Sequence, residues 1–154
     1  MHTMIVYVDD AAYARKILLP LLRGDNAQQP SHSTHWVVVA CPPSITHDIG
    51  KWVSPQALSL WREDWAAPVF EQISALLSHG LNTVSTHIAS HKRPLIEQTQ
   101  ALTQQHGAAQ VLDARRPKFG HDLEPVTAIQ PQEHNSLSGY VAAVAGAGLL
   151  VTLD

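Results

Sequence analysis

A short basic loop contains the residues whose chemistry is easiest to interpret. It follows the apolar run 109–112 and holds Arg115, Arg116 and Lys118. Guanidinium and ammonium groups bind phosphate and carboxylate, and arginine can do so through two parallel hydrogen bonds. The pattern predicts an anion-binding surface, unless the loop is only solvated or its cations pair with nearby carboxylates. Those carboxylates belong to Asp113, Asp122 and Glu124.

A pair of acids, Asp9 and Asp10, closes the first apolar run at residues 4–8. At the end of a buried strand they can contact a ligand, or cap the following helix by accepting hydrogen bonds from its first N–H groups. The pair also resembles the magnesium-holding acids of receiver domains. However, the stretch His87–His91 supplies no phosphoacceptor aspartate, and the last strand has no lysine. An adenylyl- or phosphoryl-transfer enzyme is a third hypothesis, but it would need a phosphate-binding loop.

Ten histidines and a single cysteine raise the question of a metal or a nucleophile. His87 and His91 are four residues apart but straddle a predicted strand end, and no cysteine stands at metal-ligand spacing from a histidine. Cys41 ends an apolar run beside Pro42, where nothing in the sequence lowers the thiol pKa. We therefore expect no metal site and no catalytic residue, and regard an enzymatic function as the weaker hypothesis.

Composition places these residues in one globular domain spanning residues 1–154. The chain is 45% hydrophobic and 15% charged, which is typical of a folded domain that buries its own core. A formal net charge of -3 argues against a nucleic-acid partner. One cysteine excludes an internal disulfide, and neither a signal peptide nor a long apolar run is apparent. We expect a cytoplasmic protein without a membrane partner.

Strand-like and helix-like patterns alternate along the chain and predict an α/β fold. The predicted strands are 4–8, 35–41, 83–89, 108–112 and 149–153. Apolar periodicity predicts helices between them: one through Ala14 and Leu21 that stops at Gly24, then 54–80, 94–107 and 136–145. Pro20 and Pro68 should kink or shorten their helices. The alternation predicts a mostly parallel, doubly wound sheet with helices on both faces, and the polar stretch 117–135 is either an ordered excursion or a flap.

The order of elements and three local signatures resemble the universal stress protein family, which has an adenine nucleotide α-hydrolase-like fold. The signatures are Ile5–Asp10, the stretches Ala89–Ile96 and Gln104–Leu112, and Tyr140–Leu153. The resemblance implies five strands in the order 3-2-1-4-5, an acidic residue beside adenine, and a non-enzymatic binding role in the stress response. It also implies a homodimer through the apolar last strand at the sheet edge. That strand consists of Leu149, Leu150, Val151, Thr152 and Leu153.

The phosphate loop of the family's ATP-binding members is degenerate in this chain. Those members carry glycine, two residues, glycine, nine residues, and glycine before serine or threonine. The matching positions are Asp113, Arg116 and Val126–Thr127. Because glycine lets backbone N–H groups close on phosphate, its loss argues against ATP binding in the family's manner. In the alternative, Arg115 and Arg116 hold ATP or AMP through their side chains. The predicted ligand-binding residues are Asp9, Asp10, Val39, Asp113, Arg115, Arg116, Lys118 and Thr127.

Overall fold

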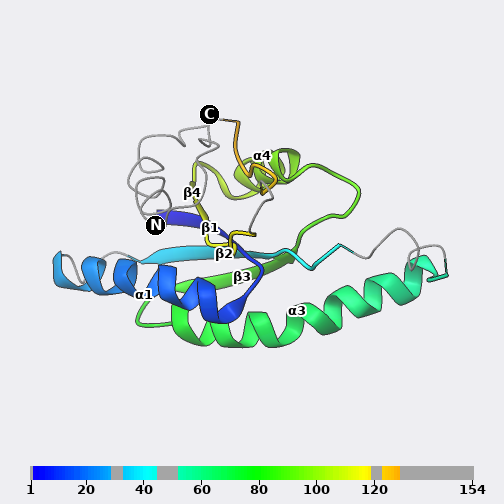
Figure 1. The fold of residues 1–154 in the computed structure, drawn as a ribbon. Coiled ribbons are helices and arrows are strands. Elements are labelled where there is room, and N and C mark those ends of the chain that lie inside the picture. The colour runs from blue at the N-terminus through cyan, green and yellow to red at the C-terminus, as the bar shows by residue number, and fades with distance from the viewer. Residues whose placement is uncertain (1, 29–32, 45–51, 119–122, 129–154) are drawn as a thin grey trace.

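The computed structural model describes residues 2–28, 33–44, 52–118 and 123–128 (Figure 1). In this part of the chain a parallel sheet separates two helices on one face, α1 and α3, from a third, α4, on the other (Figure 1). The predicted helix 136–145 and the predicted strand and dimer surface 149–153 lie outside the described residues, as do most of the stretches 45–53 and 117–135.

Four strands form the sheet: β1 (His2–Val8), β2 (Thr34–Ala40), β3 (Thr83–Ile88) and β4 (Gln110–Asp113). Their order is β3-β2-β1-β4, and every neighbouring pair is parallel. The predicted α/β class and parallel sheet are therefore confirmed, and the first four strands take the expected order. The described sheet has four strands where five were expected, and the predicted fifth strand, 149–153, lies outside the described residues.

The central strands are buried on both faces, which explains their unbroken apolar sequences. Val6 and Val8 of β1 pack on the side of α1 and α3, whereas Ile5 and Tyr7 pack on the side of α4. Side chains of β2 alternate in the same way. The two apolar clusters hold the helices against the sheet and fix the edge at which the strands end.

Helix α1 (Ala11–Gln28) continues through Pro20 and past Gly24, so the predicted stop was wrong. Pro20 is exposed, so its ring and the backbone group it leaves unbonded meet solvent rather than the sheet. Asp10 caps the helix, since its Oδ1 accepts a hydrogen bond from the Tyr13 N–H at 2.9 Å.

Helix α3 (Pro55–Leu77) begins as the sequence predicts and runs unbroken through Pro68. The Ser54 hydroxyl accepts a hydrogen bond from the Ala57 N–H at 3.1 Å, which caps the helix. All of its fully buried residues lie in its second half. The first half extends beyond the ends of the strands, as Figure 1 shows, and is therefore free to form one wall of a cleft.

Helix α4 (Leu95–His106) begins after Pro94 and ends at Gly107, whose φ of 83° lies in the left-handed region that favours glycine. Both boundaries agree with the prediction. The helix covers the opposite sheet face through Leu95 and Leu102. No helix in the described part of the chain combines the length and the apolar character needed to cross a membrane.

Candidate functional site

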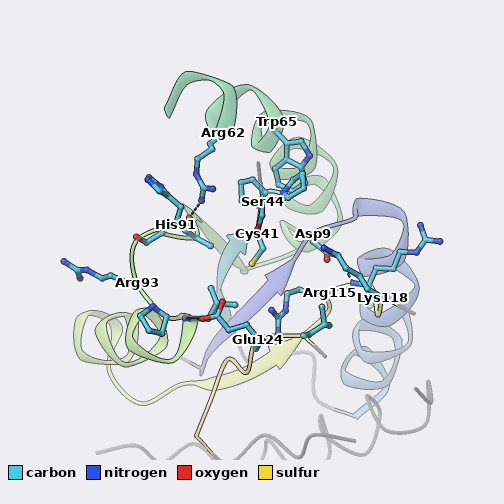
Figure 2. Close-up of a pocket in the computed structure, with 18 of the residues that line it drawn as sticks. Asp9, Cys41, Ser44, Arg62, Trp65, His91, Arg93, Arg115, Lys118 and Glu124 are labelled. Atoms are coloured by element: carbon cyan, nitrogen blue, oxygen red, sulfur yellow. Dashed lines mark hydrogen bonds between the residues drawn. The ribbon is translucent and has the colours of Figure 1, made fainter. Parts of the chain in front are cut away.

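A cleft of about 1450 Å³ lies where the strands end at their carboxyl termini (Figure 2). Its lining comes from the residues that follow each strand, from the first half of α3 and from the segment 123–124. Ligands of open α/β sheets bind at this edge, and the strand order reverses here beside β1. The structure thus brings the acid pair and the basic loop together, although 107 residues separate Asp9 from Arg116.

The two acids of the first signature have different roles. Asp10 caps α1, and its second carboxylate oxygen lies 3.8 Å from the Arg116 guanidinium. Asp9 lines the cleft, and its Oδ1 accepts a hydrogen bond from the Arg116 backbone N–H at 2.7 Å. Burial raises the pKa of the Asp9 carboxyl, and the bond from Arg116 acts against this shift. Asp9 therefore joins the ends of β1 and β4.

Arg115 is buried, with 4% of its surface exposed, and its charge is already neutralised. Its Nε donates to Asp113 Oδ1 at 2.8 Å and one terminal nitrogen donates to Asp113 Oδ2 at 2.9 Å. The same guanidinium donates to the backbone carbonyl of Glu124. Of the two interpretations of the basic loop, pairing with a carboxylate holds for Arg115. The Asp113 carboxylate holds the Arg115 side chain in place, and its negative charge is balanced by the guanidinium.

The remaining predicted site residues divide between the cleft and the core. Arg116 and Lys118 are exposed and line the cleft. Val39 is fully buried in the apolar cluster under α4. Thr127 is half-buried and is not part of the cleft lining. The predicted set is therefore gathered at one edge of the sheet, except for these last two residues.

The sequence interpretation missed a second wall of the cleft, opposite the basic loop. From α3 it contains Leu58, Arg62 and Trp65, none of which is among the predicted site residues. From the loop between β3 and α4 it contains His91, Lys92 and Arg93. The basic run before Pro94 follows a predicted strand, so the rule about strand ends could have identified it. Arg62 gave no such signal, because its place depends on how far α3 extends past the sheet.

Hydrogen bonds hold the β3–α4 loop in shape. The Ser90 N–H donates to the Gln98 side chain at 2.9 Å, and the Lys92 N–H donates to the Ser90 hydroxyl at 3.2 Å. Arg62 donates to the carbonyl of Ala89, as the dashed line in Figure 2 marks. The loop is thus tied both to α4 and to α3, and the N–H groups of Ser90 and Lys92 are occupied.

A buried network of hydroxyl groups positions the segment 123–126, which lines the cleft next to the start of α4. Thr99 of α4 contacts the Tyr7 hydroxyl, and its own hydroxyl donates to the Val126 carbonyl at 2.6 Å. Burial raises the pKa of Tyr7 to about 12, so the phenol stays protonated. With Val126 anchored, Glu124 reaches the first turn of α4, where its carboxylate accepts a hydrogen bond from the Leu95 N–H at 3.0 Å.

The cleft offers little nucleophilic chemistry. Cys41 lines it, but burial raises the pKa of this thiol to about 12, so the reactive thiolate is scarce at neutral pH. Among the described residues, no three histidine, cysteine, aspartate or glutamate side chains are placed to hold a metal ion. The arrangement is suited to binding an anion by hydrogen bonds and charge.

Comparisons with known proteins provide no relative from which a function could be transferred. No protein family model matches the chain. No curated protein matches it. No solved structure matches it. Function is accordingly inferred from the residues of the cleft.

Proposed function

We propose that this protein is a non-enzymatic binding protein of the universal stress protein type, whose cleft takes a small anionic ligand. The excess of positive charge in the cleft supports this most directly, because the chain as a whole has a net charge of -3. Six cations and three carboxylates line the cleft, and five cations remain when Arg115, which Asp113 neutralises, is set aside. The cations are Arg62, Lys92, Arg93, Arg115, Arg116 and Lys118, and the carboxylates are Asp9, Asp10 and Glu124.

The backbone after β4 supports a binding mode unlike that of the family's ATP-binding members. The Arg115 N–H donates to Asp113 Oδ1 at 3.2 Å, and the Arg116 N–H donates to Asp9 Oδ1 at 2.7 Å. Amides that would close on phosphate in a glycine loop are therefore occupied by the chain's own carboxylates. At residues 115 and 116, a ligand would therefore have to be held by side chains, because neither amide is free to bind a triphosphate.

Native mass spectrometry of the purified protein, with calorimetric titration of AMP, ADP, ATP and inorganic phosphate, tests this function. We expect either a carried anion or saturable binding of at least one of these compounds, with no turnover of ATP. An empty protein that binds none of them at millimolar concentration would refute the binding role. ATP hydrolysis that disappears in Arg116→Ala would refute the non-enzymatic part and favour the enzyme hypothesis.

We also propose that the protein is a homodimer through residues 149–153, because this sequence is apolar and uncharged until Asp154. Light scattering at micromolar concentration should give twice the chain mass. Val151→Lys should yield monomers, since a charge in a paired edge strand opposes association. Lys16→Ala, on an exposed position of α1, serves as a surface control. A monomeric wild-type protein, or a dimer that survives Val151→Lys, would contradict the proposal.

A further inference from the structure

We propose that the anionic group of the ligand binds to Arg62, Lys92 and Arg93, while its apolar body packs against Leu58 and Trp65. These five residues, three on α3 and two on the adjacent β3–α4 loop, are called the α3 wall below. The inference rests on the proposed function, because it specifies how the same cleft would recognise its ligand. It moves the anion site away from the basic loop 115–118, where the sequence suggested it.

The basic loop is a poor anion site because carboxylates already balance it. Asp113 neutralises Arg115 through two hydrogen bonds in a buried pair. Arg116 is bonded through its backbone to Asp9 and lies within 3.8 Å of Asp10 through its side chain. An anion approaching this loop therefore meets the carboxylates of Asp9 and Asp10 together with the exposed cations, and gains little net attraction.

The α3 wall keeps its positive charge. Arg62 donates to a neutral backbone carbonyl rather than to a carboxylate. Within the described part of the chain, no ion pair joins Arg62, Lys92 or Arg93 to an acid. Burial lowers the pKa of Arg62, which is the direction expected for a cation that lacks an opposite charge. An incoming phosphate or carboxylate would supply that charge.

In the loop that carries Lys92 and Arg93, part of the backbone is already hydrogen-bonded. Its backbone donors at Ser90 and Lys92 are bonded within the protein. The Leu95 N–H at the start of α4 is bonded to the Glu124 carboxylate. Glu124 also offsets part of the positive charge. The exposed side chains of Lys92 and Arg93 are the charged groups that this loop offers to an anion.

An apolar surface flanks the cation on α3. Leu58, Arg62 and Trp65 are spaced by four and three residues, so they share one helical face. Figure 2 shows Arg62 and Trp65 on the same helix beside the cleft, with His91 and Arg93 on the neighbouring loop. Aromatic rings pack well against flat heterocycles. The chemistry fits a phosphate or carboxylate attached to an aromatic or heterocyclic body, of the size of a mononucleotide.

Three double variants that each remove one arginine and one lysine test this assignment. Lys92→Ala with Arg93→Ala removes the exposed cations of the α3 wall. Arg116→Ala with Lys118→Ala removes those of the basic loop. Arg15→Ala with Lys16→Ala, on exposed positions of α1 outside the cleft lining, corrects for the loss of net charge. AMP and inorganic phosphate are titrated into each folded variant by calorimetry.

We expect the α3-wall variant to bind AMP at least about tenfold more weakly, the cost of one charge-assisted hydrogen bond. The other two variants should stay within about threefold of wild type, as for screened charges at a distance. Weaker binding in the basic-loop variant alone would overturn this inference and leave the proposed function intact. If wild-type protein binds neither compound and carries no anion, both fail.

The role of Trp65 is tested separately, by comparing the binding of AMP with that of inorganic phosphate. Trp65→Leu should weaken AMP binding but leave inorganic phosphate binding unchanged, because only AMP has a ring to pack on the indole. Trp65→Phe, which keeps an aromatic ring, should recover most of the loss. Equal weakening for both compounds would show that the substitution disturbs the cleft rather than a ring contact, and would overturn the assignment of Trp65.

Discussion

The positive charge of Arg115 is poorly available to a ligand, because the side chain is buried and its guanidinium is hydrogen-bonded to Asp113 and Glu124. Asp113 accepts two of its hydrogen bonds and the Glu124 carbonyl accepts another. Buried ion pairs of this kind are costly to break, since removing one partner leaves the other charge without compensation. The pair is therefore a structural clamp between β4 and the segment 123–126.

Asp113→Ala should lower the free energy of unfolding by about 3–5 kcal/mol, because it strands the Arg115 guanidinium in the interior. The double variant Asp113→Leu with Arg115→Met should recover most of this stability, since it leaves no buried charge. Urea unfolding curves measure both. A loss below about 1 kcal/mol in Asp113→Ala, typical of exposed pairs, would contradict the clamp.

Three histidines form a cluster on the α4 face of the sheet. The rings of His35 and His106 have centroids 5.3 Å apart, and those of His87 and His106 are 6.0 Å apart. The hydroxyls of Thr83 and Ser85 bond to His35. Burial lowers the pKa of His35 and of His87, and the neighbouring imidazole of His106 adds to both shifts. The fold therefore favours the neutral forms of His35 and His87.

Stability should fall as the pH drops below about 6.5, because the unfolded chain then takes up protons at His35 and His87 before the folded chain does. The decline continues until the pH reaches the lowered pKa values of the folded state. Urea midpoints measured between about pH 7 and pH 5 should show it, and His87→Gln should flatten the curve. His79→Gln, an exposed position after α3, is the matched control and should leave the slope unchanged.

At the scale of elements, the segment 123–126 is held in place by contacts with α4. Its Val126 side chain is buried among residues of the α4 face, and the Val126 carbonyl accepts the Thr99 hydrogen bond. The Glu124 carboxylate in turn caps α4. The helix and the segment therefore stabilise each other at the lower side of the cleft.

Thr99→Val keeps the shape of the side chain but removes the hydroxyl that contacts Tyr7 and Val126. We expect a loss of about 1–3 kcal/mol, because the buried Tyr7 hydroxyl loses its hydrogen bond to Thr99. Hydrogen exchange should accelerate at residues 123–126 and at the first turn of α4. Thr99→Ser should restore most of the protection. If exchange in this segment is unchanged in Thr99→Val, the hydroxyl network does not hold it.

At the scale of the whole molecule, a chain of net charge -3 concentrates cations in one cleft. Under the proposed function, anions would be attracted to that cleft by charges spread along its rim rather than by one deep contact. Such attraction is weakened by dissolved salt, since screening shortens its range from about 10 Å at 0.1 M to about 3 Å at 1 M.

AMP binding should accordingly weaken as sodium chloride rises from about 0.05 to about 0.5 M, because the rim cations are screened. Calorimetric titrations at a series of salt concentrations measure the slope. The α3-wall double variant, having lost two of these cations, should show a shallower slope than wild type. Affinity that does not respond to salt would mean that apolar packing on Trp65, rather than charge, dominates recognition.

Sequence patterns predicted helix and strand boundaries well where a few neighbouring residues determine them. The Ser54 cap, the end of α4 at Gly107 and the β-branched strands follow from the hydrogen bonding and steric preferences of a few neighbouring residues. Of the two outcomes predicted at Pro20 and Pro68, an early end does not occur, since both helices continue. Packing against the sheet outweighs the cost of one lost backbone bond.

The amino-acid sequence by itself determined the α/β class, the order in which strands and helices follow one another, and the edge of the sheet at which charged residues gather. These depend on periodicity and on chain order. Only the tertiary structure decided which charges are free. Asp113 neutralises Arg115 and Asp9 binds the Arg116 amide, whereas Arg62 reaches the cleft with no ion pair to any acid that the structure describes. The reason is physical: a side chain's available charge depends on burial and on partners that lie far away in sequence.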